Sequence, residues 1–162
     1  MNYKSPMGWN SWNTFGSHIN EKLIMEITDR LVSEGYQEAG YEYVIIDDCW
    51  SLRERVDGKL VADPELFPNG MKALADYVHS KGLKFGMYSC AGFKTCAGYP
   101  SSYGHEFEDA KQFAEWGVDY LKYDFCNFPE SGDAKNAYLT MAVALRNSGR
   151  KIFLAACNWG VQ

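Results

Sequence analysis

The sequence has no apolar run that approaches the roughly 20 residues needed to cross a bilayer, so we expect no membrane-spanning helix in its 162 residues. Its first residues, MNYKSPMGWNSWN, also lack the apolar core of a signal peptide. We therefore expect that the sequence either begins inside a domain or belongs to a protein that is not secreted by that route. This favours a cytoplasmic location.

Basic blocks are absent as well. The formal net charge is −5, which argues against nucleic acid and against anionic membrane surfaces as partners. With 46% hydrophobic and 23% charged residues, the composition is that of a globular chain, and the length suffices for one domain with a real core.

Several cofactor and metal motifs are missing. No GxGxxG or GxxxxGK[ST] sequence follows a strand-like run, which leaves nucleotide binding without support. The cysteines form no CxxC pair, which argues against a structural zinc site. The sequence has five cysteines, which are Cys49, Cys90, Cys96, Cys126 and Cys157. Because this number is odd, at least one thiol is free. We expect no cofactor and no metal.

What the sequence does contain is a regular alternation of strand-like and helix-like segments. Amphipathic stretches alternate with apolar runs in units of roughly 35 residues, which is typical of βα repeats and a parallel sheet. In one amphipathic stretch, 104–117, the expected apolar stripe is Phe107, Ala110, Phe113 and Ala114. The predicted strands are 6–10, 43–47, 84–89, 118–124 and 151–157, and the predicted helices lie within 20–36, 70–82, 104–117 and 131–149.

The connections differ in length on the two ends of the expected sheet. Helix-to-strand joints are short, whereas the strand-to-helix joints 48–69 and 90–103 are long. A (β/α) barrel with functional loops at the strands' carboxyl ends shows this pattern, and a doubly wound sheet follows a similar rule. Five strands and four helices fall short of the complete eight-fold barrel of about 250 residues. We therefore expect an incomplete (β/α)8 barrel of the TIM type that is cut off after its fifth strand.

Polar and aromatic side chains follow every predicted strand. Carboxylates and ammonium groups hold sugar hydroxyls by charge-assisted hydrogen bonds, and aromatic rings lie against the CH faces of sugars. Glycoside hydrolysis also needs a pair of carboxyl groups at the anomeric carbon. Any single aromatic residue could instead be core filler. In strand order the residues are Trp9, Asn10 and Trp12, then Asp47, Asp48 and Trp50, then Tyr88, then Lys122 and Asp124, then Asn158 and Trp159.

Lys122 and Asp124 lie two positions apart on one predicted strand, so their side chains point to the same side. Either charge alone would be strongly disfavoured in a buried strand, whereas a pair supports itself. We expect the lysine to lower the pKa of Asp124 and keep it ionised, as a glycosidase nucleophile requires. The alternative is a purely structural ion pair.

The adjacent Asp47 and Asp48 repel each other unless something binds them, which favours a functional role over helix capping. Metal binding is the competing functional interpretation. It is weakened because no histidine follows at ligand spacing: His18, His79 and His105 fall on predicted helices or their starts.

Five segments together resemble one known family. They are MGWNSWN, YVIIDDCW, ADPELFPNGMKALADYVHSKGLKFGMYS, KTCAGYPSSYGHEFEDAKQFAEWGVDYLKYDFC and CNWG. In this order, and over essentially the whole chain, they closely resemble family 27 glycoside hydrolases, the α-galactosidases and α-N-acetylgalactosaminidases. The resemblance implies a (β/α)8 catalytic barrel, a C-terminal β-sandwich and retaining hydrolysis by two aspartates.

The resemblance also implies roles for individual residues. The nucleophile of the family's K-[YF]-D motif falls on Asp124 and its sugar-binding lysine on Lys122. The paired aspartates that hold the galactose 4- and 6-hydroxyls fall on Asp47 and Asp48.

The remaining sugar contacts implied by the resemblance are mostly aromatic. The aromatic wall falls on Trp12, the strand-three tyrosine on Tyr88 and the strand-five tryptophan on Trp159. Asn158 falls where the family varies and recognises the sugar's 2-substituent, and an asparagine is compatible with a 2-hydroxyl, which favours galactose.

For the cysteines, the resemblance implies a disulfide between Cys96 and Cys126. Cys49 matches a half-cystine whose partner position is Ser17 here, so this second bridge is expected to be absent. Cys90 replaces a residue that is often acidic in relatives.

The family's acid/base aspartate lies after the sixth strand, beyond Gln162, with a neighbouring arginine. We therefore expect residues 1–162 to be the N-terminal portion of a (β/α)8 catalytic domain, without the rest of the barrel and the C-terminal β-sandwich. The expected substrate of the parent protein is an α-galactoside oligosaccharide, and we expect residues 1–162 alone to be inactive.

Two alternatives remain open at this point. The chain could be a non-catalytic sugar-binding or assembly half-barrel that self-associates through its open sheet edges, 6–10 and 151–157. The parent could instead prefer α-N-acetylgalactosamine or β-L-arabinopyranose.

Overall fold

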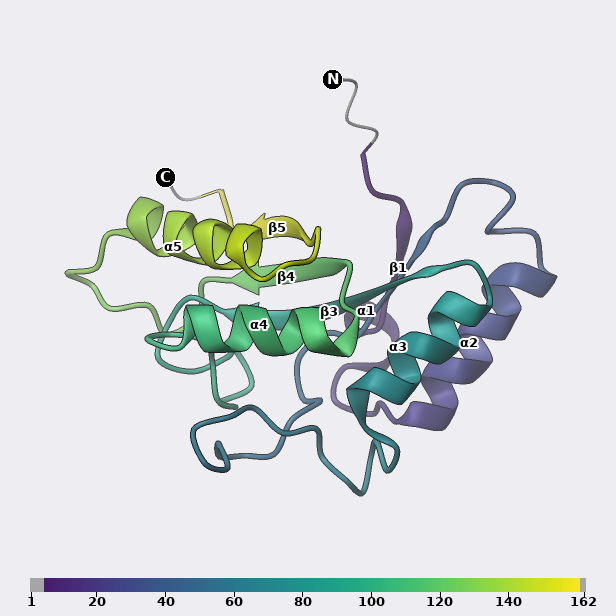
Figure 1. Ribbon diagram of the computed structural model, residues 1–162, viewed down its shortest axis with the longest axis horizontal. Helices are drawn as coiled ribbons and strands as arrows, with labels where there is room; N and C mark the ends of the chain where they lie inside the picture. The colour runs from purple at the N-terminus through teal and green to yellow at the C-terminus, as the bar shows by residue number, and fades with distance from the viewer. Residues whose placement is uncertain (1–4, 161–162) are drawn as a thin grey trace.

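The computed structural model of the protein describes residues 5–160 and shows one sheet of five parallel strands (Figure 1). The strands lie side by side in sequence order, from β1 to β5. A doubly wound sheet reverses its strand order, whereas a (β/α) barrel does not. The predicted incomplete barrel is therefore confirmed. The strands are β1 (Gly8–Asn10), β2 (Tyr43–Ile45), β3 (Lys84–Cys90), β4 (Tyr120–Asp124) and β5 (Phe153–Cys157).

Helices connect the strands, and each of the four longer helices contacts the next along the chain (Figure 1). The four predicted helices are present, and a short additional helix of four residues follows β1. None of the helices in residues 5–160 is long and apolar enough to cross a membrane. The helices are α1 (Trp12–Phe15), α2 (Glu21–Ser33), α3 (Gly70–Ser80), α4 (Glu106–Trp116) and α5 (Ala134–Asn147).

Local sequence signals explain where these helices begin and end. The side chain of Asn20 accepts a hydrogen bond from the Leu23 N–H at the start of α2, and Asp133 does the same for α5. At the end of α4, Gly117 adopts the left-handed conformation with φ 85°, which glycine reaches at low cost.

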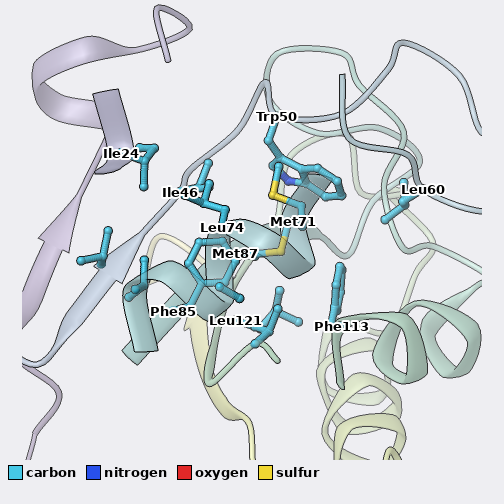
Figure 2. Packing of buried hydrophobic residues seen from close by; sticks show 14 of the residues in the cluster. Ile24, Ile46, Trp50, Leu60, Met71, Leu74, Phe85, Met87, Phe113 and Leu121 are labelled. Atoms are coloured by element: carbon cyan, nitrogen blue, oxygen red, sulfur yellow. The ribbon is translucent and has the colours of Figure 1, made fainter. Parts of the chain in front are cut away.

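The hydrophobic core lies between the helices and one face of the sheet (Figure 2). Phe85 of β3, Leu121 of β4 and Ile46, directly after β2, point into it, where they meet Leu74 of α3 and Phe113 of α4. Their burial supplies the main stabilisation of the fold, at about 25 cal/mol per Å² of apolar surface.

One predicted core residue is on the surface. Phe107 is 51% exposed, so it does not belong to the buried stripe of α4. The position that turns inward in this first helical turn is Asp109, which is 1% exposed and accepts two hydrogen bonds from the guanidinium of Arg55. The inward side of α4 thus combines this ion pair, which helical periodicity does not reveal, with the buried Ala110 and Phe113 of the predicted stripe.

The opposite face of the sheet carries a row of aromatic rings near the amino ends of the strands. Tyr120 contacts Tyr43 and stacks on Phe153. Gly86 makes room for this row, because a Cβ there would come within 2.7 Å of the Ile45 side chain and 3.2 Å of Tyr120. β1 and β5 are the edge strands, and self-association through them stays a prediction.

The hydroxyl of Tyr123 provides a test of the core. It is buried and has no hydrogen-bond partner among residues 5–160, and an unsatisfied buried polar group costs about 1–3 kcal/mol. We expect Tyr123→Phe to raise the free energy of unfolding by about 1 kcal/mol. The matched control is Tyr138→Phe, which removes a 3.2 Å hydrogen bond to the Tyr123 carbonyl and should lower the stability by a similar amount. Denaturant titration measures both, and a destabilised Tyr123→Phe variant would contradict the assignment.

Candidate active site

The register of the parallel strands places the predicted site residues in two rows at the carboxyl end of the sheet. Lys122 is level with Tyr88. Asp47 lies two residues beyond Ile45, which is level with Gly86, so Asp47 continues the row of Tyr88 and Lys122. One step further towards the carboxyl end, Asp124 is level with Cys90 and Cys157.

The lysine and the aspartate of β4 do not pair with each other, which corrects the prediction. Lys122 Nζ lies 2.8 Å from Asp47 Oδ2, and no ion pair with Asp124 is present. Side chains two residues apart on a strand share a face but stand in different rows, whereas Asp47 and Lys122 stand in the same row. The Lys122 ammonium lies 5.2 Å from the ring centroid of Tyr88, the residue that stands between Lys122 and Asp47 in this row.

The ion pair with Asp47 affects the protonation of Lys122. Burial lowers the pKa of the ammonium, but the hydrogen bond and the charge of Asp47 outweigh it and raise the pKa above its ordinary value. Lys122 is therefore a cation at neutral pH.

Asp47 is held by two further contacts from the first strand. The amide of Asn10 donates to Asp47 Oδ2 over 2.7 Å, and the Asp47 N–H donates to Ser11 Oγ over 3.0 Å. Oδ1 of the Asn10 amide accepts a hydrogen bond from the Trp12 N–H over 2.9 Å. Asn10 thus fixes the start of α1, which carries Trp12, to the buried carboxylate. The sequence reasoning named Asn10 as a strand-end residue but did not predict it as a site residue.

Asp48 is only 2% exposed and is held from the loop that follows β3. It accepts hydrogen bonds from the Ala97 N–H over 2.9 Å and from the Cys49 N–H over 2.7 Å. Burial raises the pKa of Asp48 above its ordinary value, and the Ala97 N–H opposes this in part. Cys49 adopts a φ of 75°, a strained conformation for a non-glycine residue of the kind found at functional sites.

Asp124 is oriented by donors on both of its oxygens. The Trp159 Nε1–H donates to Oδ1 over 3.0 Å and the Phe125 N–H over 2.8 Å, while the Tyr88 hydroxyl donates to Oδ2 over 3.2 Å. Cys96 Sγ lies 3.4 Å from the same Oδ2. The structure thus brings Asp124 together with Tyr88 and Trp159, whereas Lys122 is paired with Asp47 in the neighbouring row.

Exposed aromatic rings flank this group of polar side chains. Trp12 is 39% exposed and Trp159 is 62% exposed. Trp159 contacts the ring of Phe125 edge-on, and Phe125 stacks on Phe128 with 4.6 Å between ring centroids. Asn158, which precedes Trp159, is partly buried.

The cysteines follow the expectation. Cys96 and Cys126 form a disulfide, and Cys49 is a free, buried thiol. Cys90 is also free, and its thiol donates to the Cys126 carbonyl over 3.2 Å. Burial raises the pKa of Cys90 to about 11, so this thiol stays protonated.

A buried ion pair anchors the long loop that carries Asp48. Arg55 donates to both carboxylate oxygens of Asp109 on α4 and to the carbonyl of Ser101 in the loop after β3. The loop that supplies Ala97 and the loop that supplies Asp48 are therefore tied to each other and to the helix layer.

Known proteins resemble this chain in sequence and in fold. A melibiase family model described as Alpha galactosidase A matches residues 4–162. The Alpha-galactosidase A of Cellvibrio japonicus is 52% identical over 158 residues, which are 97% of this chain and 39% of that protein. The Alpha-galactosidase of Coffea arabica is 55% identical over 157 residues, or 96% of this chain and 41% of that protein.

Solved structures agree with these relatives. The structure of α-galactosidase from Saccharomyces cerevisiae with raffinose matches with a TM-score of 0.91 and 48% identity, and the match covers 96% of this chain and 35% of that chain. The α-galactosidase I of Mortierella vinacea matches with a TM-score of 0.92 and 48% identity, over 96% of this chain and 40% of that chain. The chain thus spans 39–41% of the length of the two curated relatives.

Asn10 offers a test of the hydrogen-bond network at Asp47. Asn10→Ala leaves the buried carboxylate with one donor fewer and the Trp12 N–H without its acceptor, so we expect a loss of about 1–3 kcal/mol in the free energy of unfolding. Asn13→Ala, in an exposed position of the short helix α1 that follows Asn10, is the control and should change the stability by less than about 0.5 kcal/mol. Denaturant titration of both variants decides the matter, and equal effects would show that Asn10 has no special role.

Proposed function

This chain belongs to the melibiase family of glycoside hydrolases, and we propose that the protein carrying it is a retaining α-galactosidase that releases terminal α-linked galactose from oligosaccharides. The observation that carries the proposal is the arrangement around Asp124, whose two oxygens are oriented by Tyr88, Trp159 and the Phe125 N–H. The similar structure of the α-galactosidase from Saccharomyces cerevisiae with raffinose provides further support.

Sugar recognition is assigned to Asp47 and Lys122, which stand in one row, and to Asp48, which follows Asp47 in the chain. Asp47 and Asp48 accept hydrogen bonds from the galactose 4- and 6-hydroxyls, and the Lys122 ammonium donates to a further hydroxyl. Trp12 and Trp159 supply rings for the CH faces of the sugar. Their exposure of 39% and 62% leaves ring surface free for such contact.

Asn158 is assigned to the 2-hydroxyl of the sugar, which favours galactose over a 2-acetamido sugar. The rates at which the expressed protein hydrolyses aryl α-galactoside, aryl α-N-acetylgalactosaminide and aryl β-L-arabinopyranoside compare the three specificities directly.

The chemistry assigned to Asp124 is nucleophilic attack. One of its oxygens forms a bond to the anomeric carbon while the bond to the leaving oxygen breaks, and a second carboxyl group gives that oxygen a proton. A water molecule then attacks the anomeric carbon while the second carboxylate takes a proton from this water, and the bond between the sugar and Asp124 breaks. Two inversions at one carbon retain the configuration.

We assign the second carboxyl group to sequence outside residues 1–162, which we take as the N-terminal portion of a (β/α)8 catalytic domain. The curated relatives support this assignment because the matched part covers only 39–41% of their length. Residues 1–162 alone should therefore show negligible turnover.

The nucleophile can be tested by substitution and chemical rescue. In the protein as it is expressed from its gene, Asp124→Gly should lower kcat on an aryl α-galactoside by about 10³-fold or more. Added azide should restore turnover and yield β-galactosyl azide, because a single displacement inverts the anomeric carbon. Asp76→Asn, on the exposed surface of α3, is the control and should keep full activity. A fully active Asp124→Gly variant, or rescue that yields the α-azide, would overturn the assignment.

The raised pKa of Asp48 predicts how galactose binding depends on pH. Only the ionised carboxylate accepts hydrogen bonds with both oxygens, so the affinity should fall as the pH drops through the pKa of Asp48. Since burial raises this pKa, the fall should begin above the pH expected from the ordinary value of about 3.9. One lost charge-assisted hydrogen bond corresponds to about 1.5–3 kcal/mol. Titration calorimetry with galactose between pH 4 and 7 measures the effect. Asp48→Asn should lack this step, and an unchanged profile in that variant would assign the step to another group.

A further inference from the structure

The disulfide between Cys96 and Cys126 lies directly against Asp124. Cys96 Sγ is 3.4 Å from Asp124 Oδ2, and ligand atoms from Cys96, Cys126 and Asp124 all lie within 4.8 Å of one another. Among the residues that the structure describes, these three form the one group of histidine, cysteine or acidic side chains that could surround a metal ion.

We propose that reductive opening of this disulfide creates a binding site for a thiophilic divalent cation such as Zn²⁺, with Cys96, Cys126 and Asp124 as its protein ligands. The oxidised protein has no such site, because sulfurs bonded to each other are not thiolates. The protein would therefore bind the cation only in its reduced state.

The geometry fits a tetrahedral ion. Zn–S bonds are about 2.3 Å and Zn–O bonds about 2.0–2.2 Å, so neighbouring ligand atoms around zinc are roughly 3.3–3.8 Å apart. The separation of Cys96 Sγ and Asp124 Oδ2, 3.4 Å, already lies in this range. Only the two sulfurs have to move apart, and water can fill the fourth position.

The surroundings supply access and orientation. Cys96 is exposed, so a reductant and an ion can reach it. The Tyr88 hydroxyl donates to Asp124 Oδ2 and lies 3.3 Å from Cys96 Sγ. It would orient the carboxylate from outside the first coordination sphere, in the way that such partners usually orient metal ligands.

The redox step balances with a dithiol as the reductant. A thiolate of the reductant attacks one sulfur of the Cys96–Cys126 bond and releases the other cysteine as a thiolate. The second thiol of the reductant then attacks the reductant's sulfur in the mixed disulfide, which closes the cyclic disulfide and releases the second cysteine. The protein gains two electrons and two protons as two thiols, and the reductant becomes a cyclic disulfide. Binding of the cation releases the two thiol protons.

The other free cysteines are poorer candidates as ligands. Cys49 and Cys90 are buried, and the Cys90 thiol is engaged with the Cys126 carbonyl. Cys157 is a free cysteine level with Asp124 on β5, but it is not in the group whose ligand atoms all lie within 4.8 Å of one another, so it is the control residue.

The ion would bind the carboxylate of Asp124, which we propose as the nucleophile. Zn²⁺ should therefore inhibit sugar hydrolysis by the reduced protein and leave the oxidised protein active. This consequence depends on the proposed function, whereas the binding site itself does not.

Cobalt provides a direct probe, because thiolate ligands give Co²⁺ an intense near-ultraviolet absorption. The 162-residue chain is reduced with a dithiol, freed of the reductant under argon and titrated with Co²⁺, and Zn²⁺ is then added as a competitor. We expect one Co²⁺ per chain, displaced by Zn²⁺, and no thiolate band with the oxidised chain. Equal binding by the oxidised chain would overturn the proposal.

Four variants identify the ligands. Cys96→Ser, Cys126→Ser and Asp124→Asn should each weaken Co²⁺ binding by at least about tenfold, whereas Cys157→Ser should bind like the parent. If Asp124→Asn leaves the affinity unchanged, the three-ligand site is wrong, and this holds even if reduction loosens the fold. Loss of binding in Cys157→Ser would equally contradict the assignment. No sugar takes part in these measurements, so their outcome is independent of the α-galactosidase proposal.

Discussion

The ion pair between Lys122 and Asp47 is the constraint on which the rest of the site depends. Asp47 is 2% exposed, and a buried carboxylate without a cation is strongly disfavoured. The pair in turn requires β2, β3 and β4 to be aligned so that Asp47, Tyr88 and Lys122 stand in one row. Asn10 completes this arrangement because its amide ties Asp47 to the helix that carries Trp12.

The two faces of the sheet divide the physical tasks. One face carries the apolar residues that hold the helices in place (Figure 2). At the carboxyl ends of the strands, the other face carries charges and aromatic rings that contribute little to the core. Long loops connect the two, anchored by the Arg55–Asp109 ion pair and by the disulfide next to Asp124. Stability and chemistry are thus supplied by different residues of the same strands, as in (β/α) barrels generally.

Asp124 links both functional proposals. Its donors, Tyr88 and Trp159, come from β3 and from the end of β5, and the neighbouring sulfur belongs to the loop after β3. A carboxylate that is oriented for attack on a carbon is also oriented as a ligand. In the cation-site proposal the disulfide has a second role besides bracing two loops, because it keeps the two sulfurs from acting as thiolate ligands beside this carboxylate.

The sequence by itself determined the order of strands and helices, because periods of two and of about 3.6 residues follow from backbone geometry alone. It also predicted that Asp47, Asp48, Lys122 and Asp124 lie at one edge of the sheet, because parallel strands carry their polar residues to one edge. Only the tertiary structure decided which of these charges meet. Lys122 pairs with Asp47 and not with Asp124, because inter-strand register, unlike periodicity, depends on every strand of the sheet. For the same reason the inward turn of Asp109 and the bridging position of Asn10 became visible only once distant segments were in contact.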